Sequence, residues 1–184
     1  MKLTKKNAAI GMLCSFAFAG AVQAQVYTEV SYSNLTSRGT VSSGNTESNG
    51  QSVAGIVGYG LNSNFSVEGL LGTGLGGADV KLNGASQAHP VTSRLDQVVG
   101  VYVRGKKDLN EDASVFVRLG WNEWRTTASN NLGSTSSTLS DWAYGVGLNY
   151  RINQSMYVTG SWMSVYNKDS VKVDGWTVGL GYRY

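Results

Sequence analysis

One histidine and two nearby serines are the residues of this chain whose types could support hydrolysis. His89 is the single histidine, and Ser86 and Ser93 lie a few positions away from it. Nucleophilic hydrolysis needs a serine and an orienting group held within hydrogen-bond reach of the base. All three residues lie in or beside a flexible loop segment. We therefore expect a solvated loop histidine, no catalytic residue, no cofactor and no metal site.

A second set of residues consists of carboxylates and guanidinium groups in otherwise alternating apolar and small-residue segments. Charges removed from water must be paired or hydrated, so residues of both signs that share an interior are expected to pair. Two interpretations are open, a polar plug that fills the interior and a gated ion path through it. The six residues are Glu29, Glu68, Arg104, Arg118, Arg151 and Arg183. The strands that position these residues help to decide between the plug and the ion path.

The first 24 residues have the pattern of an export signal. Lys2, Lys5 and Lys6 form a basic start, the stretch 8–20 is apolar, and residues 22–24 (Val-Gln-Ala) supply the small residues of a cleavage site. The apolar stretch is shorter than the roughly 20 residues that a membrane-spanning helix needs. Cys14 lacks the preceding small residue expected of a lipidated cysteine. We expect a cleaved signal peptide over residues 1–24 and one domain over 25–184.

Removal of the signal peptide changes the charge and the cysteine content. Its three lysines equal the formal net charge of +3, so the remaining chain is formally neutral, and Cys14 is the only cysteine. A neutral chain gives no support for nucleic-acid binding. The absence of further cysteine excludes disulfides, thiolate metal sites and cysteine nucleophiles from the exported protein.

The exported part reads as alternating segments of about ten to thirteen residues, separated by breaks rich in Gly, Ser and Asn. This spacing is typical of membrane β-strands. Eight segments are predicted: 26–36, 51–60, 65–76, 94–105, 113–125, 140–152, 156–167 and 174–184. The longer breaks, 37–50, 77–93, 126–139 and 168–173, alternate with the shorter ones, 61–64, 106–112 and 153–155. With both termini in the periplasm, all four longer breaks would be extracellular loops.

The faces of these segments indicate which side points inward. In segment 140–152, Trp142, Val146 and Leu148 share one face, whereas Gly145 and Gly147 share the other. The six charged residues lie on the face with the glycines. An eight-stranded barrel is only wide enough to be filled by side chains, so small and a few charged residues suit its interior. We therefore expect the bulky face to meet lipid and the charges to form a packed plug.

Closure follows from the solvent, because hydrocarbon cannot satisfy unpaired backbone groups and the first strand must pair with the last. The sequence predicts an all-β, eight-stranded antiparallel transmembrane up-and-down β-barrel. Aromatic residues near the strand ends predict two interfacial girdles. The expected periplasmic members are Tyr59, Phe65, Tyr150, Tyr182 and Tyr184, and the expected extracellular members are Trp121, Trp142 and Trp176.

Short motifs support this architecture. The segment 144–152 (YGVGLNYRI) with its following turn 153–155 resembles the outer-membrane β-barrel family of the opacity, OmpX-like and OmpA transmembrane-domain proteins. Residues 64–68 (NFSVE) are similar to the third strand of that family, and 179–184 (GLGYRY) to its closing strand. The resemblance implies that the closing strand is recognised by the barrel-assembly machinery through an aromatic terminal signal. That signal is the set Trp176, Val178, Leu180, Tyr182 and Tyr184.

These observations predict a small integral protein of the outer membrane of a Gram-negative bacterium, reached by export through the periplasm. We expect a non-enzymatic role in envelope integrity and surface interaction, with adhesion as an open possibility, through four extracellular loops. A small porin-like channel is the alternative, and a lipid A-modifying enzyme that uses His89 ranks third. The expected partners are outer-membrane lipid and lipopolysaccharide, the barrel-assembly machinery, and a host or surface ligand of the loops. No nucleic-acid partner is expected.

Overall fold

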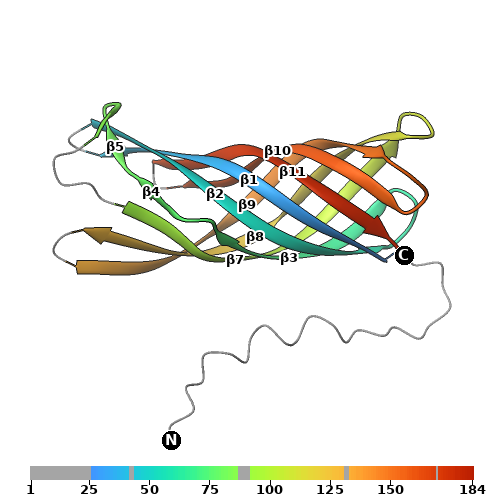
Figure 1. Cartoon of the computed structure of the whole chain (residues 1–184), viewed down its shortest axis with the longest axis horizontal. Coiled ribbons are helices and arrows are strands. Elements are labelled where there is room, and N and C mark those ends of the chain that lie inside the picture. The colour runs from blue at the N-terminus through green and yellow to red at the C-terminus, as the bar shows by residue number, and fades with distance from the viewer. Residues whose placement is uncertain (1–25, 42–43, 87–91, 131–132, 169) are drawn as a thin grey trace, which may run out of the picture.

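A computed structural model describes residues 26–41, 44–86, 92–130, 133–168 and 170–184. The predicted signal peptide, His89 and Pro90 lie outside these residues. Figure 1 shows a long cylinder of strands, with the C-terminus at one end. The eight long strands are β1 (Val26–Val41), β2 (Gly44–Gly60), β3 (Phe65–Gly74), β7 (Thr92–Asp108), β8 (Ala113–Asn130), β9 (Gly133–Arg151), β10 (Met156–Lys168) and β11 (Val171–Arg183).

The strands form a closed antiparallel ring, as predicted. Each long strand pairs with its neighbour along the chain, and β1 pairs with both β2 and β11. The backbone N–H of Tyr184 donates to the carbonyl of Val26 at 3.0 Å, so the first and last described residues meet at one end. Closure gives each of the eight long strands two paired neighbours, which is the requirement that lipid places on a sheet. No helix in the described ranges is long and apolar enough to cross a membrane.

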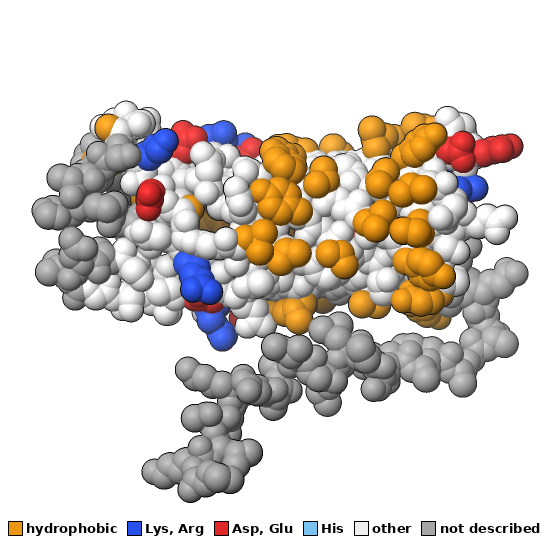
Figure 2. Space-filling model, in the orientation of Figure 1, with side chains coloured by type: hydrophobic (Ala, Val, Ile, Leu, Met, Phe, Trp, Pro, Cys, Tyr) orange, Lys and Arg blue, Asp and Glu red, His pale blue; other side chains and the backbone are white. Residues whose placement is uncertain are grey.

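The side chains alternate around the ring in the predicted inside-out sense. Val146 and Leu148 on β9 are each 56% exposed, and Val178 and Leu180 on β11 are 48% and 46% exposed. The same parity holds in β2, where Ile56 is buried and Val57 is exposed. On the face shown in Figure 2, hydrophobic side chains gather on the half of the barrel that carries the C-terminus. The prediction of an outward-facing apolar surface is confirmed.

Three short turns at the end near the C-terminus share one design. Each contains an asparagine, Asn62, Asn110 or Asn153, whose Oδ1 accepts hydrogen bonds from the backbone N–H groups two and three residues later, at 2.7 to 3.0 Å. This Asx geometry replaces ladder hydrogen bonds where the chain reverses. The turns fix the register of the hairpins they close. They coincide with the predicted short breaks, except that residues 106–108 continue β7.

The longer breaks are mostly strand, which corrects the prediction of loops. Residues 37–41 and 44–50 extend the β1–β2 ladder, and residues 126–130 and 133–139 extend the β8–β9 ladder. The β10–β11 ladder likewise runs to Lys168 and Val171. The polar side chains of these segments indicate that both faces of the strands contact water. They do not indicate an irregular backbone, because the two strands of a hairpin can pair their backbone groups without a core.

The second long break holds three short strands, β4 (Gly77–Asp79), β5 (Lys81–Leu82) and β6 (Ala85–Ser86). β4 pairs with β7, whereas β5 pairs with β2 and β6. Asn83 and Gly84 join β5 to β6 with φ angles of 50° and 79°. Two successive positive φ values match the tight turn that Asn-Gly favours between antiparallel strands. This segment packs along β2 and β7 at the end remote from the C-terminus.

Two irregularities change which residues point inward near that end. The register of β10 shifts between Ser164 and Tyr166, and that of β7 shifts between Leu95 and Gln97. Ser164, Val165 and Tyr166 are consequently all buried. A bulge adds one residue to a strand and reverses the phase of those beyond it. The shifts therefore place additional side chains in the lumen at the end remote from the C-terminus.

Candidate functional site

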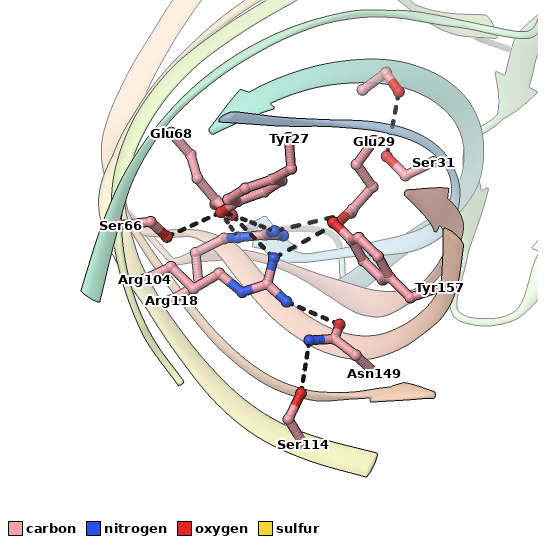
Figure 3. Close-up of polar contacts among 11 residues, drawn as sticks. Tyr27, Glu29, Ser31, Ser66, Glu68, Arg104, Ser114, Arg118, Asn149 and Tyr157 are labelled. Atoms are coloured by element: carbon pink, nitrogen blue, oxygen red, sulfur yellow. Dashed lines mark hydrogen bonds and ion pairs between the residues drawn. The ribbon is translucent and has the colours of Figure 1, made fainter. Parts of the chain in front are cut away.

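The lumen near the C-terminal end contains a cluster of four charged side chains, Glu29, Glu68, Arg104 and Arg118 (Figure 3). All four are at most 4% exposed. Glu68 is the centre, with its Oε2 2.5 Å from Arg118 Nε and its Oε1 3.2 Å from Arg104 Nη1. Glu29 approaches the same two guanidinium groups at 3.7 and 3.8 Å. Two cations and two anions thus neutralise one another inside the barrel.

Strand register explains why these groups meet. Arg104 on β7 and Arg118 on β8 are direct cross-strand partners, which places like charges side by side. Such a pair is destabilising unless anions lie between or beside the charges. β3, the other neighbour of β7, supplies Glu68, and β1, which lies across the ring from β8, supplies Glu29. Each carboxylate contacts both arginines, so removal of one anion would leave excess positive charge in a buried site.

Neutral side chains complete the cluster. Tyr27 donates to Glu68 Oε1 at 2.5 Å, and Tyr157 donates to Glu29 Oε2 at 3.3 Å. Asn149 accepts from Arg104 Nη2 at 2.8 Å. The Arg104 guanidinium carbon lies 3.8 Å from the centroid of the Phe116 ring. These contacts hold the charged groups in one arrangement and fill the cross-section of the lumen.

Sequence reasoning did not identify the aromatic members, although a signal exists. Tyr27 stands directly opposite Gly58 on β2, and Tyr157 stands directly opposite Gly181 on β11. A Cβ at either glycine would overlap the facing ring. An aromatic residue inside a narrow barrel needs such a gap on the adjacent strand. Paired inward positions of this kind, one aromatic and one glycine, would have predicted the rings.

Two of the six predicted plug residues do not join the cluster. Arg151 is the last residue of β9 and its side chain is exposed, so its placement in the plug is wrong. Arg183 is half-buried and stacks over the Tyr157 ring, with 4.8 Å between guanidinium carbon and ring centroid. Both lie at strand ends beside the mouth of the barrel, where water can solvate a charge. Correct inward parity was not sufficient, because depth along the axis also decides burial.

The cluster offers little to acid–base or metal chemistry. Each of its two carboxylates is paired with guanidinium groups and accepts a hydrogen bond from a tyrosine hydroxyl. No group of three metal-ligating side chains of the His, Cys, Asp and Glu types occurs in the described ranges. Ser93 is half-buried on β7, opposite Ala78 of β4. The arrangement is that of a packed cluster of paired charges in the lumen.

The other half of the lumen has a different character. Leu35, Tyr102, Ala143, Met163 and Val165 form a buried apolar cluster, with Leu70, Trp124 and Val173 packed against it. The inward face was predicted to carry small and charged residues, and the prediction is wrong for this half. The physical reason is that a lumen packed with side chains is a protein interior, in which apolar groups avoid desolvating charges.

The five residues predicted as a terminal signal lie on β11 and directly after it. Trp176, Val178, Leu180, Tyr182 and Tyr184 are all exposed on the lipid-facing side. The rings of Tyr182 and Tyr184 pack edge to face at 5.0 Å between centroids. The exposed aromatic residues of the two predicted girdles also point outward. Recognition of β11 by the barrel-assembly machinery stays a prediction.

Comparison with known proteins agrees with this architecture. Similar solved structures include Ail of Yersinia pestis, the N-terminal β-barrel domain of OprF of Pseudomonas aeruginosa, and Neisserial surface protein A. Their identities are 19%, 13% and 14%, and their TM-scores are 0.59, 0.58 and 0.55. The matches cover 89%, 88% and 86% of this chain and 100%, 100% and 97% of the others. No curated protein matches the chain.

The family comparison is more specific. Residues 7–184 match the model of the outer membrane protein beta-barrel domain. This match spans the whole ring and explains the outward apolar surface as the contact with the outer membrane of a Gram-negative bacterium. The chain belongs to the outer membrane protein β-barrel domain family.

Proposed function

We propose that this barrel is a non-enzymatic surface protein that holds four rigid β-hairpins above the outer membrane. The observation that carries the proposal is the continuation of paired strands beyond the extracellular tryptophans. Residues 122–130 of β8 and 133–141 of β9 extend past the Trp121–Trp142 pair, which spans about 30 Å along each strand. Such hairpins present polar side chains in a fixed arrangement, which lowers the entropy cost of binding a partner.

Charged side chains on the paired strands β1 and β11 suggest an anionic partner. Arg38 on β1 and Lys172 on β11 are direct cross-strand neighbours, with side chains 55% and 47% exposed. Both approach the same carboxylate, Asp174 Oδ1, at 3.3 and 3.8 Å. Glu47 on β2 stands directly opposite Arg38, and Lys81 on β5 directly opposite Glu47, so three cations and two anions lie together here and leave positive charge available. Figure 2 shows charged side chains on this half of the barrel, beyond the apolar surface.

Sulfated or phosphorylated saccharides fit this charge best. The sugars of lipopolysaccharide carry phosphate in the same zone, and host surfaces carry sulfated polysaccharide. Ail, which shares the fold, was crystallised with the heparin analogue sucrose octasulfate. Arg38 and Lys172 lie about 13 Å along the strands from Trp176, a distance that suits the saccharide layer over the membrane. The packed lumen argues against a channel as the main role.

Calorimetric titration with sucrose octasulfate tests this proposal. The refolded protein in nanodiscs of uncharged lipid should bind the probe, with affinity that falls as salt rises. An Arg38→Ser/Lys172→Ser variant should bind about tenfold more weakly. The matched control, Lys106→Ser/Lys107→Ser, removes two cations near the opposite end of the barrel and should bind as the parent does. Absence of binding, or equal loss in both variants, would overturn the proposal.

The non-enzymatic part needs its own measurement. The third-ranked enzyme hypothesis depends on His89. Mass spectrometry of lipid A from cells that express the parent chain and His89→Ala should give identical species. A modification of lipid A that appears with the parent and disappears with the variant would establish catalysis and end this part of the proposal.

A further inference from the structure

The extracellular end of the lumen contains a cavity of about 170 Å³ above the apolar cluster. Seven of the eight long strands contribute to its wall, β3 being the exception, so it lies within the ring of strands. Its larger apolar wall residues are Leu35, Leu95, Trp124, Leu139, Tyr166, Val171 and Val173. Serine, threonine, glutamine and small residues complete the wall, and no charged side chain is among the described residues that line it.

A floor separates this cavity from the charge cluster. Tyr102 on β7 donates a hydrogen bond to Asn122 on the neighbouring β8, and both side chains are at most 4% exposed. Met163 and Ala143 are buried beside them. A molecule that enters from the extracellular mouth would therefore stop at this level. The cavity is a vestibule for binding and has no open route through the barrel.

One polar atom in the wall lacks a partner. The indole Nε1 of Trp124 is buried and donates no hydrogen bond to any described residue. Buried indole N–H groups usually have an acceptor, because the group loses its hydrogen bond to water on burial. Trp124 belongs to the wall of the cavity, and a rotation of the indole toward the cavity would let an acceptor on a bound molecule satisfy this donor.

We propose that the vestibule binds a small neutral aromatic molecule that carries one hydrogen-bond acceptor. Apolar pockets with a few polar groups that fix orientation are typical of small-molecule sites. An apolar cavity of about 150 Å³ accommodates one benzene ring, so this one is of the size for a single substituted ring. The uncharged wall favours a neutral ligand. This inference is independent of the saccharide-binding role, which concerns the outer faces of the hairpins.

Fluorine NMR of protein labelled with 5-fluorotryptophan provides a direct test, with acetophenone as the probe. Trp124 faces the vestibule, whereas Trp121, Trp142, Trp162 and Trp176 are exposed on the outer surface. The outer four report acetophenone dissolved in the nanodisc lipid, and their signals should shift without saturating. The Trp124 signal, assigned with a Trp124→Phe variant, should shift and saturate. Ethylbenzene, which has no acceptor, should bind about threefold to tenfold more weakly.

A matched pair of glycine variants locates the site. Gly50 lines the vestibule opposite Leu35, and a Cβ at this position would meet open space. Gly50→Leu should fill the vestibule and abolish the saturable shift. Gly55→Leu places the same side chain on the same strand, where the outer face also has open space, and should leave the shift unchanged. Ser48→Leu is a second vestibule-filling variant if Gly50→Leu does not fold.

The outcomes are distinct. Saturation at Trp124 that both Gly50→Leu and Ser48→Leu remove, and that Gly55→Leu retains, supports the site. A Trp124 shift that stays linear with the other four signals would show partitioning into lipid only and would overturn the proposal. Saturation that survives in a folded, vestibule-filled variant would overturn it as well.

Discussion

The two halves of the lumen solve the same packing problem with opposite chemistry. Near the C-terminal end, the charges of Glu29, Glu68, Arg104 and Arg118 cancel within one buried cluster. Toward the opposite end, apolar side chains such as Leu35 and Met163 fill the same lumen. The comparison shows that inward-facing positions of one barrel obey different rules at different depths. Charges tolerate burial where partners from several strands converge, and apolar residues replace them elsewhere.

The largest predicted effect is in the charged half. Glu68→Gln keeps the shape of the side chain but leaves Arg104 and Arg118 with Glu29 as their one remaining anion. Breaking a buried ion pair by removing one partner costs about 3 to 5 kcal/mol. The free energy of unfolding, measured by urea titration in lipid vesicles, should fall by this amount.

Glu111→Gln is the matched control for this change, because Glu111 lies exposed in the turn between β7 and β8. Its effect should stay within about 0.5 kcal/mol. A loss below about 1 kcal/mol for Glu68→Gln would mean that the charge cluster does not stabilise this half of the barrel as described.

The next largest effect is in the apolar half. Met163→Ala removes a side chain that is 5% exposed and leaves a void beside Leu35 and Ala143. Truncation of a buried methionine costs about 2 to 5 kcal/mol. The same urea titration should show this loss, with Val178→Ala on the lipid face as the control. Equal losses from the two substitutions would contradict a packed interior in this half.

A smaller loss of stability is expected where the Tyr102 ring occupies the space left by a glycine on the adjacent strand. Gly120 stands opposite Tyr102, and a Cβ there would overlap the ring and the backbone of Val101. Gly120→Ala should destabilise the barrel by about 1 to 3 kcal/mol through overpacking. Gly69→Ala adds the same methyl group on the outer face, where nothing lies within 4 Å, and should be neutral or slightly stabilising. Unfolding midpoints that rank the variants in reverse would refute the pairing of rings with glycines.

The smallest effect concerns Arg151, one of the two predicted plug residues that lie outside the cluster. Arg151→Gln changes an exposed side chain and should alter the free energy of unfolding by no more than about 0.5 kcal/mol. A loss as large as that of Glu68→Gln would show that the charged half extends to the mouth of the barrel.

Much of this arrangement could be predicted from the sequence, because period-two alternation is a local property. The strand order, the closure of β1 on β11 and the outward position of Val146 and Leu180 followed from alternation and the demands of lipid. The extended external hairpins did not, since Ser- and Thr-rich segments read as loops whether or not their backbones pair. The apolar upper lumen depends partly on bulges at Ser164 and Leu95, and a bulge leaves no clear mark on a single sequence.

The charge cluster was partly predictable for a related reason. Parity identified Glu29, Glu68, Arg104 and Arg118 as inward, yet it also selected Arg151, which lies too close to the mouth to be buried. Depth along the barrel depends on strand tilt and on the relative stagger of neighbouring strands. Those quantities are set by long-range register, which no local pattern contains.

Single-channel recording in planar lipid bilayers tests the central claim most directly, namely that the paired charges close the lumen. The refolded protein should insert without giving any stable open state, because Glu68 and both arginines fill the cross-section together with Phe116 and Tyr157. Reproducible, long-lived conductance steps from the parent protein would contradict the claim and favour an ion path through these residues.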